Sequence, residues 1–158
     1  MKKILSIMVT ITGAFYLAAG IGLLVFQNTI KEFMGYSAVQ GVELINVYPI
    51  QILLELALLG IPCVVLGILS MSESVESNKS LNLLMAIYSG VMLVLSGLLA
   101  NIGGLISNYT ASRFMGVEGM VNISLVTAAF GWIEFMSSLS LVLLLVRSAF
   151  SLGEIKKM

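Results

Sequence analysis

Long runs of apolar residues alternate with short polar stretches along this chain of 158 residues. Four of the runs, over residues 4–26, 49–71, 81–106 and 122–146, each reach the roughly 20 residues that a helix needs to cross the hydrocarbon core of a bilayer. None of the runs alternates between apolar and polar positions as a barrel strand does, and a backbone in lipid must satisfy its own hydrogen bonds. The pattern therefore predicts an all-α protein, a bundle of four transmembrane helices.

The composition leaves little room for anything else. Hydrophobic residues make up 59% of the chain and charged residues only 10%, whereas about a quarter of the residues of a soluble domain are charged. We therefore expect a single integral membrane domain over residues 1–158 and no separate soluble domain. Lys2 and Lys3 before the first run imitate a secretory signal, but the run is longer than the ~7–15 apolar residues of such a signal, so we expect an uncleaved first span.

Basic residues near the ends of the runs predict the orientation of the bundle, because lysines and arginines concentrate at the cytoplasmic ends of spans. Lys31 and Arg113 lie on one side of the predicted bundle. The other six basic residues lie on the opposite side, namely Lys2, Lys3, Lys79, Arg147, Lys156 and Lys157. We therefore expect a multi-pass membrane protein with both termini in the cytoplasm. The Ser-rich stretch over residues 72–80 on that side is expected to be a solvated connector.

Small residues four positions apart predict which helices pack closely, because they let two backbones approach in lipid. This spacing occurs in the first run at Ala14, Ala18 and Gly22, and in the third run at Ser96, Ala100 and Gly104. We therefore expect the first and third helices to form the centre of the bundle.

The second run contains two residues that affect its packing. Pro62 lacks a backbone N–H and lies near Gly60, which predicts a kink near the middle of the membrane. Cys63 is the only cysteine of the chain, so no intramolecular disulfide can form and we expect Cys63 to be a packing residue.

A short triplet recurs along the chain. Phe33-Met34-Gly35 and Phe114-Met115-Gly116 each follow an outward run, and each precedes an inward run with one carboxylate, Glu55 or Glu134. The recurrence favours two parallel helical-hairpin repeats. The distance from triplet to carboxylate differs by two residues between the copies, which rotates a helix position by about 200°, so chance similarity between hydrophobic hairpins is the alternative.

Glu55 and Glu134 lie inside the apolar runs, where a charge costs on the order of a few kcal/mol and usually has a function. Gln51 lies four residues before Glu55, and Asn101 lies at a similar depth in the third run, so these three side chains could form a polar cluster. Counting about 1.5 Å per residue from the outer ends puts Glu55 about 9 Å deep and Glu134 about 18 Å deep. We expect two separate sites, which serve either ion binding or contacts between helices and subunits.

The residue types exclude several classes of function. The chain has neither histidine nor aspartate, so the usual ligands of haem, copper, zinc and di-iron sites are missing and we expect no metal or cofactor. Its net charge is zero without a basic cluster, which argues against nucleic acid as a partner. No pattern resembles a nucleophile with its base or a phosphate-binding loop, so we expect no enzyme.

One sequon is a candidate for glycosylation. Of the three Asn-X-Ser/Thr sequons, Asn78 lies on the side assigned to the cytoplasm, and Asn122 lies too near the membrane boundary. Asn108, in the outer loop predicted over residues 107–121, is therefore the candidate.

The carboxylates on the second and fourth runs invite comparison with a known family. The stretch from Leu95-Ser96-Gly97-Leu98 through Arg113 to Glu134 resembles the third and fourth helices of the rotor-ring proteolipid of vacuolar and archaeal ATP synthases. That resemblance implies a proton-translocating subunit with a carboxylate on each even-numbered helix. The chain departs from the family in three ways: the family's inner helices are richer in Gly and Ala, its hairpin loops face the cytoplasm, and its termini face away from the cytoplasm.

Nearly all side chains suit contact with lipid or with other helices, and the loops are short. We therefore expect a non-enzymatic protein, a small structural or accessory subunit of a larger membrane assembly. Its partners would be other membrane protein subunits or copies of itself, in addition to the lipid bilayer. The alternative is a subunit that translocates protons or cations through Glu134 and Glu55. An enzyme acting on lipid or quinone is a third hypothesis, which has no support beyond the membrane location.

Overall fold

A computed structural model describes residues 1–26, 29, 53–114 and 117–155 of the chain, and every regular element in these ranges is helical. The elements are α1 (Lys2–Val25), the π-helical turn η3 (Leu56–Gly60), α4 (Ile61–Leu69), α5 (Glu73–Glu76), α6 (Lys79–Phe114) and α7 (Val117–Ile155). The all-α expectation is confirmed. Three helical stretches are long and apolar enough to cross a membrane, at Lys2–Val25, Lys79–Leu98 and Gly131–Ile155, and Leu53–Leu69 forms a shorter apolar helix. These are the features of a multi-pass membrane protein.

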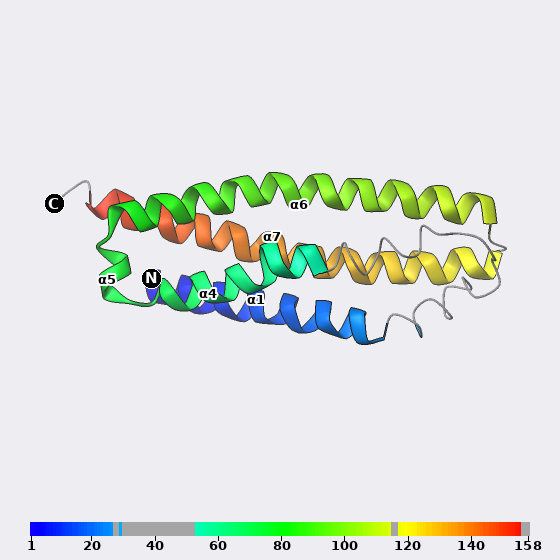
Figure 1. Cartoon of the computed structure of the whole chain (residues 1–158), viewed down its shortest axis with the longest axis horizontal. Coiled ribbons are helices and arrows are strands. Elements are labelled where there is room, and N and C mark those ends of the chain that lie inside the picture. Colours follow the sequence, from blue (N-terminus) through cyan, green and yellow to red (C-terminus); the bar gives the residue numbers. More distant parts are fainter. Residues whose placement is uncertain (27–28, 30–52, 115–116, 156–158) are drawn as a thin grey trace.

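The helices form an elongated bundle in which α7 lies between α6 and the pair α1 and α4 (Figure 1). The α7 helix contacts α1, α4 and α6, so it is the central helix. The expectation that the first and third helices form the centre is wrong. Ala14 is exposed, and a Cβ added at Gly22 would meet no described atom within 4 Å. The small-residue spacing in the first run therefore faces away from the bundle.

A different face of α1 makes the contacts. Its buried residues are separated by three and four positions in turn, Ser6, Val9, Gly13, Tyr16 and Gly20, which is the spacing of one face of a helix. A Cβ at Gly13 would lie 3.1 Å from Cβ of Cys63, on α4. A Cβ at Gly67 of α4 would lie 2.5 Å from Oγ1 of Thr10. Glycines on both helices therefore let α1 and α4 approach closely.

Proline changes the hydrogen bonding of the second apolar segment. In an α-helix the N–H of residue 62 would bond to the carbonyl of Leu58, but Pro62 has no N–H. The structure contains the π-helical turn η3 just before Pro62, in which the N–H of Ile61 bonds to the carbonyl of Leu56. The hydroxyl of Tyr88, on α6, donates a hydrogen bond to the carbonyl of Leu58. The distortion expected here is thus a π-helical turn, supported from a neighbouring helix.

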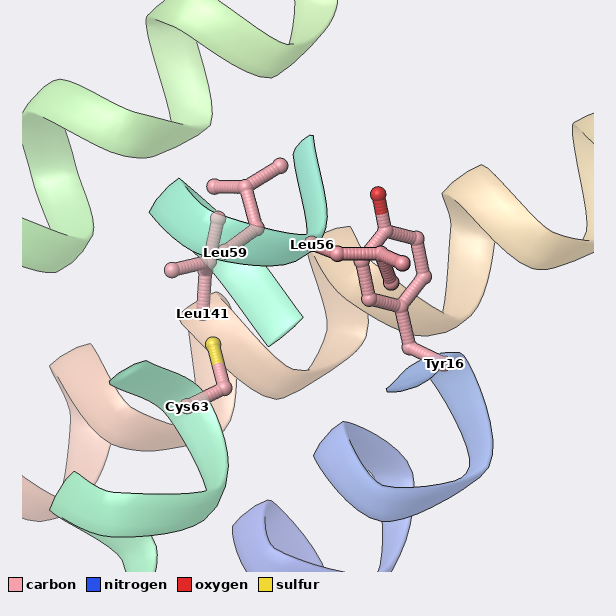
Figure 2. Close-up of a cluster of buried hydrophobic side chains, with 5 residues drawn as sticks. All are labelled: Tyr16, Leu56, Leu59, Cys63 and Leu141. Carbon is pink, nitrogen blue, oxygen red and sulfur yellow. The ribbon is translucent and has the colours of Figure 1, made fainter. Parts of the chain in front are cut away.

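Two apolar clusters hold the helices together. Figure 2 shows the first, in which α1, η3, α4 and α7 contribute Tyr16, Leu56, Leu59, Cys63 and Leu141. The thiol of Cys63 is free and buried here, as expected of a packing residue. The second cluster lies nearer the N-terminus of α1 and consists of Val9, Val75, Met85 and Leu144.

The long helices do not end where the apolar runs end. The α6 helix has 36 residues and α7 has 39, so at about 1.5 Å per residue they extend about 54 and 58 Å, well beyond a hydrocarbon core of about 30 Å. The loop expected over residues 107–121 is therefore almost entirely helical. Polar residues show where a helix leaves lipid, but they do not end the helix. Neither of the two prolines of the chain, Pro49 and Pro62, lies in this part.

Several sequence features fall outside the described ranges. Gln51, the first triplet, Met115 and Gly116 lie there, so the predicted duplication stays a hypothesis. Asn101 and Asn108 lie within α6, and only their backbone is described. The glycosylation candidate Asn108 is thus on a helix and not in the predicted loop.

Candidate functional site

The first polar site lies within the apolar part of the bundle. Glu55 immediately precedes η3, and its Oε2 accepts a hydrogen bond of 3.1 Å from the hydroxyl of Tyr16. The ring of Tyr16 is buried and lies beside Leu56 in the first apolar cluster (Figure 2). The hydrogen bond therefore ties α1 to the start of the second apolar segment.

The second intramembrane carboxylate is close to this contact. Glu134 is half-buried on α7 and lies within electrostatic range of both Glu55 and Tyr16. The expectation of two separate sites stays a prediction. Tyr16 is a hydrogen-bond partner of Glu55 that the sequence pattern did not indicate.

We expect Tyr16→Phe to lower the stability of the folded protein by about 0.6 kcal/mol and at most about 1.7 kcal/mol, the range found for hydrogen bonds between helices in lipid. The measurement is the unfolding midpoint in an SDS titration of the protein in mild detergent, followed by circular dichroism. Thr12→Val is the control, because the hydroxyl of Thr12 donates within its own helix, to the carbonyl of Met8 at 2.8 Å. Equal midpoints for the two variants would show that the hydrogen bond from Tyr16 to Glu55 does not stabilise the bundle.

A second polar site lies where α1 begins and α7 ends. Arg147 is fully buried there. Its Nη2 donates to the carbonyl of Ser70 at 2.5 Å, and its Nη1 donates to Oδ1 of Asn82. The hydroxyl of Ser70, at the end of α4, donates to Oγ of Ser6 at 2.8 Å. The guanidinium therefore connects α4, α6 and α7, and Ser6 adds α1 to the same network.

The short helix α5 is fixed to this network. The amide of Asn82 donates to the carbonyls of Val75 at 2.7 Å and Asn78 at 2.8 Å, while the side chain of Val75 is buried in the second apolar cluster. The expectation of a solvated connector over residues 72–80 is therefore wrong for Val75. The sequence pattern around Arg147 predicts only the orientation of the bundle, because a basic residue near the end of a span usually lies at the membrane surface.

Ion pairs surround the buried network. Lys2 pairs with Glu76 of α5, and its Nζ lies 2.5 Å from Oε2 of Glu154 of α7. Lys3 and Glu73 form a more exposed pair at 3.8 Å. The hydrogen bond from Lys2 lowers the pKa of Glu76 below its ordinary value of 4.5, and the positive charges of Lys2 and Arg147 act in the same direction. The beginning of α1 is therefore held to two other elements.

The lowered pKa of Glu76 predicts a pH dependence. Ionised Glu76 favours the folded state, so its contribution to stability is complete above pH 4.5 and is lost as the pH falls through the lower pKa of the folded state. We expect acid to destabilise the wild-type protein more than Glu76→Gln, by less than about 1 kcal/mol because the pair is partly exposed. Unfolding midpoints measured between pH 7 and pH 3 test this. Glu73→Gln is the control and should keep the wild-type pH profile; parallel profiles for all three proteins would contradict the assignment.

Comparisons with known proteins assign no family: no family model, curated protein or solved structure matches the chain. The similarity to the rotor-ring proteolipid therefore stays a resemblance of sequence pattern.

Proposed function

We propose that the chain is a four-helix integral membrane protein that acts as a structural or accessory, non-enzymatic subunit of a larger membrane assembly. The ion pair between Lys2 and Glu154 supports the helix count. It puts the start of α1 and the end of α7 on one side of the membrane, which requires an even number of crossings. Three helical stretches are long enough to cross the membrane, and Leu53–Leu69 is apolar but shorter. Under this proposal the shorter helix is the fourth crossing, which makes the number even.

The observation that carries the proposal is the apolar outer surface. One face of α6 has five large apolar residues at alternating spacings of three and four, each at least 51% exposed, namely Leu84, Ile87, Val91, Val94 and Leu98. Such a face is stable only when lipid or another helix covers it, and its spacing suits helix-to-helix packing. Meanwhile the half-buried carboxylate of Glu55 and the buried guanidinium of Arg147 form contacts inside the bundle, which suits a structural role better than a catalytic one.

The long hairpin of α6 and α7 supports the same proposal. If the polar network of Arg147 lies at one membrane surface, a helix of about 54 Å continues about 25 Å past a 30 Å core on the other side. A helical projection of this length offers partner subunits a surface outside the bilayer. Under this proposal the termini are cytoplasmic, because most of the basic residues lie at their end of the bundle.

The test is the mass of the particle after extraction into mild detergent or nanodiscs. We expect it to exceed that of a single 16.9 kDa chain, and we expect Ile87→Ala with Val94→Ala to reduce it. Ile11→Ala with Phe15→Ala, at exposed positions of α1, is the matched control. A strictly monomeric particle in nanodiscs would count against the proposal.

A second candidate function is the translocation of protons or cations. It is favoured by the electrostatic interaction of Glu134 with Glu55 and by the hydrogen bond from Tyr16 to Glu55, because ionisable groups inside a membrane are typical of proton pathways. It predicts that ion flux into proteoliposomes is lost in Glu134→Gln and Glu55→Gln but kept in Glu73→Gln. Flux that survives both intramembrane substitutions would eliminate this candidate.

A further inference from the structure

A cavity opens at the end of the bundle where α1 begins and α7 ends. Its volume is about 350 Å³, which falls at the lower end of the roughly 300–1,000 Å³ of small-molecule sites. Its walls come from α1, α5 and α7 and the residue after α5, and they consist of Lys2, Glu73, Glu76, Ser77, Ser151, Glu154 and Ile155. The cavity thus lies among the ion pairs of Lys2, and Ser151 in its wall lies one helical turn beyond Arg147 on α7.

A buried hydroxyl in the wall of this cavity has no hydrogen-bond partner. Ser151 is 1% exposed, and its Oγ bonds to no atom of the described residues. The same holds for Oγ of Ser148 and Nε of Arg147, which lie three and four positions earlier and therefore on the same face of α7. A buried polar group without a partner costs about 1–3 kcal/mol. Oγ of Ser151 is itself covered in this structure, so an occupant of the cavity would bond to it after rotation of the side chain, and this bond would remove part of the cost.

The charges around the cavity have both signs. Lys2 supplies an ammonium that already contacts Glu76 and Glu154. Glu73 pairs only loosely with Lys3, at 3.8 Å, and the side chain of Glu154 remains 59% exposed. The rim therefore offers carboxylate oxygens to a cationic group, while Lys2 and Ser151 offer donors to an anionic group. No set of three or more metal-ligating side chains occurs among the described residues, so a metal ion does not fit.

The position of the cavity specifies the kind of molecule further. Three apolar helical stretches begin or end at Lys2, Lys79 and Ile155, so this end of the bundle lies at the depth of the lipid headgroups. We propose that the cavity binds the headgroup of a phospholipid that carries a primary ammonium group and a phosphate. The ammonium donates to Glu73 and Glu154, and the phosphate accepts hydrogen bonds from Lys2 and Ser151. This inference requires a membrane location but not a particular partner subunit.

The test is native mass spectrometry of the full chain released from nanodiscs that contain equal amounts of phosphatidylethanolamine, phosphatidylcholine and phosphatidylglycerol. We expect at least a fivefold excess of phosphatidylethanolamine adducts. Phosphatidylcholine has a quaternary ammonium that donates no hydrogen bond, and phosphatidylglycerol has no ammonium. Glu73→Gln with Glu154→Gln should reduce the excess to parity, and Ser151→Ala should reduce it several-fold. Glu134→Gln, a carboxylate removed elsewhere on α7, should keep it.

Two further measurements keep the result interpretable. Circular dichroism of each variant shows whether it is folded, and Ser151→Ala removes a single hydroxyl if the double variant fails to fold. Soluble phosphoethanolamine, added in excess, should displace little lipid, because it lacks the acyl chains. If a low concentration of phosphoethanolamine displaced all the lipid, the cavity would bind a free phosphoethanolamine and not a lipid headgroup. Equal adducts of the three lipids, or an excess unchanged in Ser151→Ala and in the double variant, would overturn the proposal.

Discussion

Asn82→Leu should destabilise the protein by about 1.5–3 kcal/mol, the contribution of a hydrogen bond to a charged group. Asn82 is completely buried, and its Oδ1 accepts a hydrogen bond from the buried guanidinium of Arg147. Its amide also donates to the carbonyls of Val75 and Asn78. A leucine of similar size removes these contacts but leaves the positive charge in place. The unfolding midpoint in SDS, with circular dichroism as the readout, measures the effect.

The same network predicts that the effects of two substitutions are not additive. Arg147→Met removes the charge together with its need for acceptors, so Arg147→Met with Asn82→Leu should be more stable than Asn82→Leu alone. Ser77→Ala is the control, because the Ser77 hydroxyl donates to carbonyls of its own exposed turn, those of Glu73 and Ser74. If the double variant shows the sum of the two single effects, Arg147 and Asn82 do not form a coupled pair.

The sequence predicts the helical class and the membrane location, because both depend on local composition. It does not predict where α6 and α7 end, because a polar stretch without proline continues as helix after leaving the apolar region. It also misidentifies the central helix. The spacing of Ala14, Ala18 and Gly22 is compatible with close packing, but the face with Gly13 and Gly20 meets the partner helix. Which small residues are used depends on the arrangement of the helices, which no single run contains.

The sequence also predicts the candidate sites only in part. Glu55 and Glu134 stand out in the sequence because charge inside an apolar run is rare. The partner of Glu55 does not stand out, because Tyr16 is 39 residues away in the sequence. The buried network is even harder to predict from the sequence, since Asn82 and Arg147 are 65 residues apart. An arginine at the end of a span has the same sequence pattern whether it faces the membrane surface or the interior.

Gly67→Ala should destabilise the protein by about 1–3 kcal/mol, the usual cost of overpacking a tight contact. The added Cβ would lie 2.5 Å from Oγ1 of Thr10 and 3.0 Å from its backbone nitrogen. The hydroxyl can rotate away with its side chain, but the backbone nitrogen moves only if α1 moves. Relief of the contact therefore requires α1 and α4 to separate, which disturbs the neighbouring contact of Gly13 with Cys63.

Gly90→Ala and Gly22→Ala are matched controls, because a Cβ at either position meets no described atom within 4 Å. Alanine is favoured over glycine in a helix by about 1 kcal/mol, so these two variants should be as stable as the wild-type protein or more stable. The same substitution of glycine by alanine is thus expected to lower stability at Gly67 and to keep or raise it at Gly90 and Gly22. The unfolding midpoints measure this difference. A Gly67→Ala variant as stable as Gly90→Ala would show that α1 and α4 are not in close contact there.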